Sequence, residues 1–444
     1  MTQPRASQPT IGFIDRYCSQ YQSVFPEVRS YEAFKRMLIG IITPSQRKSL
    51  SRIAKIVGLK QSQSLHHFIT NSPWTYQELR AVRLKLILDW LKGEAIDIII
   101  DETGDPKKGN HTEYVARQYL GRLGKVDNGI VSVNIYGLKD GIVFPIIFEI
   151  YKPKPRLKPG DTYQSKPQIA VTLVKELLEL GIVIKRVLAD SLYGESSTNL
   201  IGALEELQLK FMVSIRSNHG VWMSKTEKVR QNRWRKFERV FSDGHTETRY
   251  VSEVIFGHRR SYTYWYVTTD PETLPENSTS YVMTNIPDVN YQDIGNIYGL
   301  RTWVEYGFKQ CKSELGWADF TLTKYADIAR WWELICCGFL LISSLALAPQ
   351  PSQPTQISTC QTELESYLAA HADWQQKAGW KSMLNNVQLL LLPLLAFNLV
   401  KPWLRVFSNP LLTSSFLALI SIVDLCANAF LDRDLTTIHS FSSA

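Results

Sequence analysis

The stretch Ile96–Gly109, "IDIIIDETGDPKKG", decides the fold predicted for this chain. Its apolar run "IDIII" is typical of a strand buried on both faces of a sheet, and the run ends at Asp101 before loop-forming residues. A carboxylate at the end of a buried strand is costly to desolvate without a counter-ion, and open α/β sheets place their sites at strand ends. Asp101 is therefore a candidate site residue.

The following 110 or so residues predict the rest of this sheet. Two strands, a helix closing at Gly181, a second buried strand running into Asp190, a further helix and a last strand follow in order; they are "GIVSVNIYG", "GIVFPIIFEIY", "KPQIAVTLVKELLEL", "IVIKRVL", "SSTNLIGALEEL" and "KFMVSI". This order is that of a mixed α/β sheet of the ribonuclease H type, which places the ends of the first and fourth strands side by side. Either aspartate alone reads as a solvated loop residue, but the pair in adjacent strand ends favours a shared site.

A shared pair of strand-end carboxylates is typical of a site for a hard cation. Asp101 and Asp190 offer oxygen ligands and leave positions for water and phosphate. This donor set suits Mg²⁺ or Mn²⁺ better than zinc. Glu102 and Asp105 crowd Asp101 but are expected to lie past the strand end, as supporting or loop residues.

The stretch "YGLRTWVEYGFKQCK" (298–312) is predicted to be one helix that supplies a third acid. At about 3.6 residues per turn, Tyr298, Arg301, Glu305 and Lys312 would project from one face. Glu305 would complete the metal site, while the Tyr298 hydroxyl and the two cations would bind phosphates. The alternative is a surface helix with an Arg301–Glu305 ion pair, worth a few tenths of a kcal/mol.

The chain divides by pattern into helical ends and an α/β middle. The predicted parts are a helical DNA-binding domain (1–94), the α/β core (95–215 and 292–348), a β-rich insertion (216–291), a Pro- and Gln-rich linker (349–363) and a Leu-rich helical region (364–444). Within the first part, "SLSRIAKIVGLKQSQSLHHFIT" has the outline of a helix-turn-helix turning at Gly58. Its second helix would display Gln61, Gln63, Ser64 and His67; a three-helix structural bundle explains the same pattern equally well.

The charge pattern favours a polyanionic partner. The net charge is +8, and residues 216–240 hold eight Lys or Arg against two Glu, interleaved with aromatics, which favours a phosphate track over a merely solvated face. Arg233, Arg235 and Lys236 lie in that track, and Lys107 and Lys108 follow Asp101.

Cysteine usage and hydropathy favour a cytoplasmic protein. The six cysteines show no metal-ligand spacing, so buried free thiols are expected. The apolar runs at 334–348 and 386–400 fall short of the roughly 20 residues that span a bilayer, so we expect buried helices and no membrane partner.

The residues around the three acids resemble one family. The spacing Tyr298, Arg301, Glu305, Lys312 reproduces the Tyr-Arg-Glu-Lys signature of a branch of bacterial insertion-sequence transposases of the DDE class. "DETGDPKKG...ARQYLGRLGKV" and "ADSLYG" resemble the regions of that branch around the first and second catalytic Asp. The resemblance covers roughly residues 96–345.

The resemblance implies a ribonuclease H-like core with Asp101, Asp190 and Glu305 as catalytic, metal-binding triad. Two ions (Mg²⁺ or Mn²⁺) would activate water and then a DNA 3′-hydroxyl for attack on phosphodiesters. It also implies a β-rich insertion before Glu305. Some members of the family flip a base onto an aromatic of that insertion; Trp222, Trp234 and Trp265 are candidates, although a buried core role is the ordinary expectation for each.

The function expected from this resemblance is DNA transposition. The protein would bind the terminal inverted repeats of its element as double-stranded DNA, pair them as a homodimer, cut them and join them to target DNA, in the bacterial cytoplasm on the nucleoid. Two alternatives stay open at this point: a domesticated, non-catalytic DNA-binding protein, and a ribonuclease H-like nuclease without strand transfer.

Overall fold

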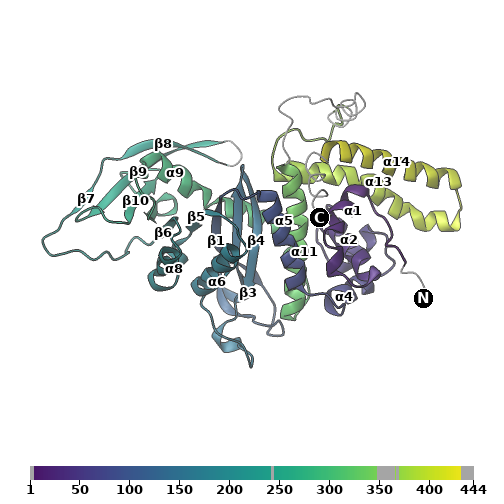
Figure 1. The fold of residues 1–444 in the computed structure, drawn as a ribbon, viewed down its shortest axis with the longest axis horizontal. Helices are drawn as coiled ribbons and strands as arrows, with labels where there is room; N and C mark the ends of the chain where they lie inside the picture. Colours follow the sequence, from purple (N-terminus) through teal and green to yellow (C-terminus); the bar gives the residue numbers. More distant parts are fainter. Residues whose placement is uncertain (1–4, 242–244, 348–365, 367–369, 432–444) are drawn as a thin grey trace, which may run out of the picture. The chain divides into compact units, whose positions relative to one another are not determined.

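The computed structural model describes residues 5–241, 245–347, 366 and 370–431 (Figure 1). The chain forms two compact units, one of residues 91–308 and one that combines residues 1–90 with residues 309–444. The predicted core segment 292–348 is thus shared between the two units. The predicted linker, 349–363, lies outside the described residues.

The unit of residues 91–308 is built on one mixed sheet of 11 strands. The strands lie in the order β2-β3-β1-β5-β6-β11-β10-β9-β7, with β4 paired to β3 and β8 paired to β9. Only the pairs β1–β5 and β5–β6 are parallel. The bounds are β1 Ile96–Pro106, β2 Ala116–Leu120, β3 Lys125–Lys139, β4 Ile142–Ile150, β5 Ile184–Ala189, β6 Phe211–Ile215, β7 Val229–Gln231, β8 Arg235–Val240, β9 Thr246–Phe256, β10 Thr263–Thr268 and β11 Ser280–Thr284.

Strand β1 is longer than the sequence predicted, and this corrects the place of Asp101. The parallel pairing with β5 stops at Ile100, opposite Ala189, but the antiparallel pairing with β3 continues to Pro106. Asp101 therefore lies inside β1, at the point where its parallel neighbour ends. The prediction that Glu102 and Asp105 lie past the strand end is wrong, because β3 is long enough to pair with both.

The helices of this unit lie mainly between the strands in sequence. Helix α6 begins with a capping box between Ser165 and Gln168 and packs on β3 and β4. The helical segments are η2 Gly121–Leu123, η3 Lys154–Arg156, α6 Lys166–Glu179, α7 Ser191–Gly194, the π-helical turn η4 Ser197–Ile201, α8 Gly202–Glu206, η5 Glu276–Ser278, α9 Tyr291–Leu300 and α10 Trp303–Lys309. The predicted loop "YKPKPRLK" contains η3.

Strands β7 to β11 extend the core sheet. Strand β11 pairs with β6 from Thr284↔Met212 to Tyr281↔Ile215, so the hydrogen-bonded ladder runs on without a gap. Figure 1 shows these strands continuing away from β1, with α9 lying over β8 and β9, which both contact it. The β-rich character predicted for residues 216–291 is present, but its strands share the sheet of the core.

The second unit is helical. Helix α11 runs through its core, where the buried Glu333 carboxylate accepts hydrogen bonds from Arg80 Nε at 2.5 Å and Arg83 Nε at 2.9 Å. The segments are α1 Gly12–Ser19, η1 Gln22–Val24, α2 Val28–Ile42, α3 Leu50–Ile56, α4 Gln63–Thr70, α5 Tyr76–Leu91, the π-helical turn η6 Gln310–Glu314, α11 Tyr325–Ala346, α13 Trp380–Val406 and α14 Pro410–Leu431.

Helices α11 and α13 are long and apolar enough to cross a membrane by length and composition. Of their most apolar windows, 89% of that in α11 is buried but only 39% of that in α13. The expectation of a buried helix is therefore confirmed for the first apolar run and wrong for the second, because one side of α13 has no described neighbour. Cys18, Cys311, Cys336 and Cys337 are buried free thiols, as predicted.

Candidate active site

Asp101 and Asp190 are brought together by the parallel register of β1 and β5. Ile100 pairs with Ala189, so the two aspartates occupy the next position on neighbouring strands. One oxygen of each is already held by backbone, since Asp101 Oδ1 accepts from the Glu102 amide at 2.7 Å and Asp190 Oδ1 accepts from the Leu192 amide at 2.9 Å. This side-by-side placement is as predicted.

The electrostatics of the pair show a shortage of positive charge. Burial raises the pKa of Asp101 to about 8, and the neighbouring Asp190 charge adds to the increase. Burial and then Glu102 raise the pKa of Asp190. Both pKa values rise although Arg301 acts in the opposite direction on each. Two crowded carboxylates with insufficient compensation fit a divalent cation, which would supply the missing charge.

Helix α10 lies on the sheet face to which Asp101 belongs. Side chains two apart on a strand share a face, so Asp101 points to the same side as Ile99. Ile99 is paired with Tyr136 of β3, whose ring contacts Phe308 of α10 with centroids 5.2 Å apart. Gly307 lies so close to this ring that an added Cβ would be 2.6 Å from it. The sheet thus fixes how closely the helix carrying Glu305 approaches.

The predicted single helix from Tyr298 to Lys312 is wrong. Helix α9 ends at Leu300 and α10 begins at Trp303, and four successive amides from Arg301 to Glu305, excluding Trp303, bond to the carbonyl three residues back. The Thr302 hydroxyl donates to the Gly299 carbonyl at 2.9 Å, which competes with the main-chain ladder. A 3₁₀ segment turns roughly 20° more per residue than an α-helix, so Glu305 is rotated from its predicted direction.

Arg301 lies among the acids. Burial opposes its charge, but the Tyr298 hydroxyl and the carboxylates of Asp101, Asp190 and Glu305 together raise the pKa of Arg301. Its Nε is buried without a hydrogen-bond partner among the described residues. Arg301 therefore serves as counter-ion to the acids in this structure and still has a free donor. Its guanidinium carbon lies 5.9 Å from the Tyr298 ring centroid.

The other signature residues differ in exposure. Tyr298 is buried, at 8% exposed, while Glu305 is exposed. Lys312 lies in η6, which belongs to the helical unit, so its distance from the acids is not compared. Within the described residues no three His, Cys, Asp or Glu side chains form a group that could hold a metal ion. Asp101 and Asp190 fit a divalent ion, and Glu305 is not yet gathered with them.

Glu102 is a further acid at the site, whose position the sequence analysis misjudged. It follows Asp101 in β1 and so points to the opposite face, where Lys166 at the start of α6 pairs with it at 3.0 Å. Burial, Glu102, Asp101 and Asp190 all raise the pKa of the fully buried Tyr193. Only the length of β3 could have shown that Glu102 is in a strand.

The predicted DNA-binding residues of the sheet unit lie largely at the surface. Trp265 is buried, as a core tryptophan should be, but Trp222 is 92% exposed and Trp234 is half-buried, so the core expectation is wrong for Trp222. Trp222 lies in a loop that no strand covers. The exposed cations are Lys108, Arg233, Arg235 and Lys236, and Lys107 is half-buried.

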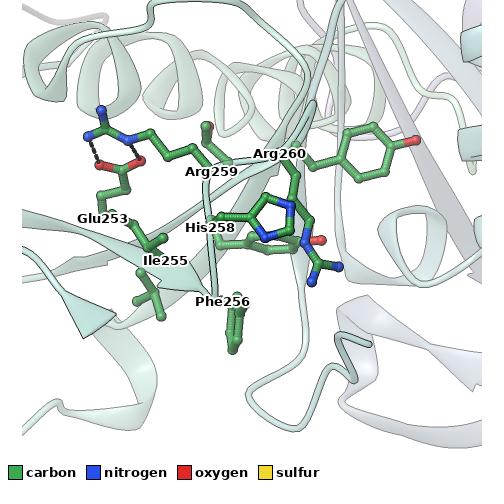
Figure 2. Close-up of a pocket in the computed structure, with 10 residues that line it drawn as sticks. Glu253, Ile255, Phe256, His258, Arg259 and Arg260 are labelled. Atoms are coloured by element: carbon green, nitrogen blue, oxygen red, sulfur yellow. Dashed lines mark hydrogen bonds and ion pairs between the residues drawn. The ribbon is translucent and has the colours of Figure 1, made fainter. Parts of the chain in front are cut away.

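A second cluster of cations at the β9–β10 turn surrounds a small hollow (Figure 2). Arg259 makes a two-point contact with Glu253, as Figure 2 shows, with Nη2 at 2.8 Å. His258 and Arg260 both lie beside Glu227, at 2.7 and 3.6 Å. Because all three cations already face acids, this hollow is a weaker phosphate site than β8.

The predicted helix-turn-helix pattern corresponds to α3 and α4, which turn at Gly58 with φ +73°. Lys48 does not contribute to its surface charge: its ammonium is buried, donates to the Thr43 carbonyl, and burial lowers the pKa of Lys48 to about 8. The four residues predicted to read DNA, namely Gln61, Gln63, Ser64 and His67, are exposed.

Comparison with known proteins agrees with a phosphodiester-cleaving site. Residues 22–251 match the family described as DDE superfamily endonuclease. A relative from Microchaete diplosiphon, described as "Probable transposase for insertion sequence element IS701", is 55% identical over 328 residues, which cover 74% of this chain and 86% of the relative. A solved structure of the piggyBac transposase synaptic complex with hairpin DNA aligns at 11% identity and a TM-score of 0.43, covering 93% of this chain and 82% of that one.

The chain therefore belongs to the DDE superfamily of endonucleases, enzymes that cleave phosphodiesters with divalent metal ions. Within that superfamily it is a DDE transposase of the insertion-sequence type.

Proposed function

We propose that this transposase binds the terminal inverted repeats of an insertion sequence and catalyses both strand cleavage and strand transfer on a ribonuclease H-like core. The observation that carries the proposal is the pair of Asp101 and Asp190 in register on parallel strands, with Arg301 beside them. A non-catalytic DNA-binding protein would have no need to keep two carboxylates buried against each other. The complete set of acids and signature residues supports an enzyme.

Asp101 and Asp190 would hold the divalent ions, with Glu305 as the third ligand. We propose two ions, Mg²⁺ or Mn²⁺, which when bound would polarise the scissile phosphate and activate water or a 3′-hydroxyl. The backbone amides of Glu102 and Leu192 orient one oxygen of each aspartate and leave the other free. Glu305 approaches through α10, whose exposed carboxylate faces solvent until DNA and metal arrive.

Arg301 would change partner during the reaction. In this structure it compensates the acids, and a divalent ion would make that compensation unnecessary. Its guanidinium, with a buried unused Nε, would then bind a DNA phosphate. Tyr298 is too buried to reach far, so it would act next to Arg301, and Lys312 would bind a phosphate further along the strand.

The remaining contacts would position DNA. We propose that Gln61, Gln63, Ser64 and His67 of the α3–α4 pair recognise the terminal repeat, and that Lys107, Lys108, Arg233, Arg235 and Lys236 hold phosphates. Trp222 is the most exposed candidate for stacking a flipped base, an interaction worth roughly 1–3 kcal/mol. A Trp222→Ala protein should keep DNA affinity but cleave hairpin-forming ends more slowly; unchanged cleavage would remove Trp222 from this role. The protein would act in the bacterial cytoplasm, on the nucleoid.

The proposed homodimer would form through helices α13 and α14. These two helices lie side by side (Figure 1), and Phe397 packs on Phe416 between them. Their outer surface exposes eleven large apolar side chains: Leu392, Leu399, Trp403, Val406, Phe407, Leu411, Leu412, Leu417, Leu419, Ile422 and Leu425. Together these expose on the order of 1,000 Å², close to the roughly 800 Å² that each partner buries in a standard interface.

A second copy is the occupant that matches this surface in size and polarity. Light scattering should show the dimer fall to monomer when Leu399 and Ile422 are both changed to Glu, while the exposed-loop control Gln46→Glu stays dimeric. A wild-type chain that is monomeric both alone and on paired DNA ends would contradict the proposal, as would binding of the same surface to lipid vesicles in preference to itself.

The experiment for the function is a cleavage assay on a labelled duplex carrying the terminal repeat of this element. With Mg²⁺ or Mn²⁺ we expect nicking at the repeat end and, with target plasmid present, joined products. With EDTA we expect a gel shift without cleavage. A shift without cleavage under all conditions would favour the non-catalytic alternative, and nicks without joined products would favour a nuclease.

A further inference from the structure

The face of α9 that meets strand β8 contains two glycines one turn apart. Gly295 lies against Phe237, whose ring atoms would be 2.0 Å from an added Cβ, and Gly299 lies against Arg239, whose Nε would be 3.1 Å from one. Phe237 and Arg239 are two apart on β8 and share a face. The pair of glycines lets the strand approach the helix closely, so β8 is seated on α9 just before that helix ends.

Arg239 bonds directly to the point where α9 gives way to α10. Its Nη2 donates to the Gly299 carbonyl at 3.2 Å and to the Thr302 hydroxyl at 2.8 Å. The Thr302 hydroxyl in turn donates to the same Gly299 carbonyl at 2.9 Å. Arg239 therefore closes a three-membered network around a carbonyl at the end of a helix, where backbone acceptors lack intrahelical donors.

The rest of the Arg239 side chain is held as firmly. Its guanidinium carbon lies 4.4 Å from the Phe241 ring centroid, and the side chain is half-buried. Burial and the nearby Arg249 and Arg301 charges lower the pKa of Arg239, so its place is not explained by charge attraction alone. A cation kept close to two other arginines is there for its hydrogen-bond geometry.

This junction, Arg301–Thr302, separates the signature residues into two groups. Tyr298 and Arg301 precede it or lie in it, while Glu305 follows it in α10. The direction of Glu305 relative to Asp101 and Asp190 depends on the 3₁₀ turn between Gly299 and Glu305. A residue that fixes this turn fixes the third acid of the site without contacting metal or DNA.

We propose that Arg239 is a positioning residue that clamps the α9–α10 junction and sets the approach of Glu305 to the Asp101–Asp190 pair. The inference rests on the proposed roles of these three acids. It also assigns strand β8 two tasks on its two sides: Arg235 and Lys236 face solvent, where they would bind DNA, and Arg239 connects the same strand to the acid-bearing helix.

The test is a set of variants in single-turnover cleavage with separate measurement of DNA affinity. Arg239→Ala should lower the cleavage rate on the order of 10- to 100-fold, the range expected for a small misplacement of a reacting group. It should also raise the metal concentration for half-maximal rate, with little change in DNA affinity. Arg239→Lys, which keeps one donor, should be intermediate. Arg235→Ala removes the same charge from the same strand and should instead weaken DNA binding and leave the rate at saturating DNA unchanged.

A double-mutant cycle identifies the clamp itself. Thr302→Val removes the hydroxyl at the centre of the network and should slow cleavage by the same mechanism, so the Arg239→Ala/Thr302→Val protein should be no slower than the slower single variant. Rate losses that multiply, or an Arg239→Ala protein that loses DNA affinity but not rate, would overturn the inference.

Failure of the inference can be told from failure of the proposed function. If the acids are wrongly assigned, Asp190→Asn will cleave as well as the wild type. If only the clamp is wrong, Asp190→Asn will be inactive while Arg239→Ala cleaves at the wild-type rate. Melting temperatures of all variants within a few degrees of the wild type would exclude misfolding as the cause of any loss; if Arg239→Ala proves unstable, Thr302→Val and Arg239→Lys carry the test.

Discussion

The two halves of the candidate active site are built in different ways. Asp101 and Asp190 come from neighbouring parallel strands, are held by backbone amides and lie in a sheet whose register leaves them no freedom to separate. Glu305 comes from a short helix behind a 3₁₀ junction and is exposed. The strand half exists before any ligand binds, whereas the helix half has an adjustable joint.

This difference suggests how a transposase would avoid cleaving DNA at random. Two carboxylates that repel each other form a site ready to accept a cation, but the third acid has to be brought in through α10. Contacts that fix the junction, among them that of Arg239, would decide when the site is complete. Variants that damage the two halves separately should therefore differ in their effects on stability as well as on rate.

The largest effect is expected in the strand half. Asp101→Asn should reduce cleavage by a factor on the order of 10³ or more, because metal-ion catalysis supplies several kcal/mol. In EDTA at neutral pH the same variant should melt at a higher temperature than the wild type, since burial and Asp190 oppose the charge of Asp101 in the folded protein. Calorimetry and a gel assay measure the two changes; a lower melting temperature would contradict the electrostatic description of the pair.

The helix half should lose rate without gaining stability. Glu305→Gln should cleave on the order of 10²-fold more slowly, because the third ligand is lost while Asp101 and Asp190 still hold metal. Its melting temperature in EDTA should equal that of the wild type, since the side chain is exposed. Glu206→Gln, an exposed acid in α8, is the matched control and should be normal in both measurements. Wild-type cleavage by Glu305→Gln would remove Glu305 from the site.

The smallest effect should come from moving the helix rather than removing its acid. Gly307→Ala places a methyl group 2.6 Å from a Tyr136 ring atom and should push α10 off the sheet, slowing cleavage about tenfold. Alanine favours the helix by about 1 kcal/mol, so helix propensity would act in the opposite direction. Gly121→Ala, where nothing lies within 4 Å, is the control. Equal rates for the two variants would show that the approach of α10 does not limit the reaction.

The same division separates what the sequence could predict from what it could not. Asp101 and Asp190 were predictable because the apolar runs before them mark buried strands, and parallel register then brings their ends together. The junction after Leu300 was not, because it depends on Thr302 and on an arginine some 60 residues earlier whose contact no local pattern reveals. For the same reason the residues Arg301 and Glu305 were placed on one face of a helix that does not exist as one piece.

Long-range pairing explains the other errors. Strand β1 was ended too early because its extension depends on β3 alone, and the strands from β7 onward were expected to stand apart although β11 pairs with β6. Lys48 was counted as surface charge because its burial depends on the Thr43 carbonyl and on neighbours distant in sequence. In each case the local pattern was interpreted correctly and the tertiary partner could not be inferred.

The most direct test of the central claim is a crystal structure of the protein with a terminal-repeat duplex and Mn²⁺, with the metal located by anomalous scattering. The account predicts anomalous peaks coordinated by Asp101 and Asp190, with Glu305 completing the coordination and Arg301 turned to a DNA phosphate. Peaks at other residues, or a metal site formed on bound DNA without Glu305, would contradict it.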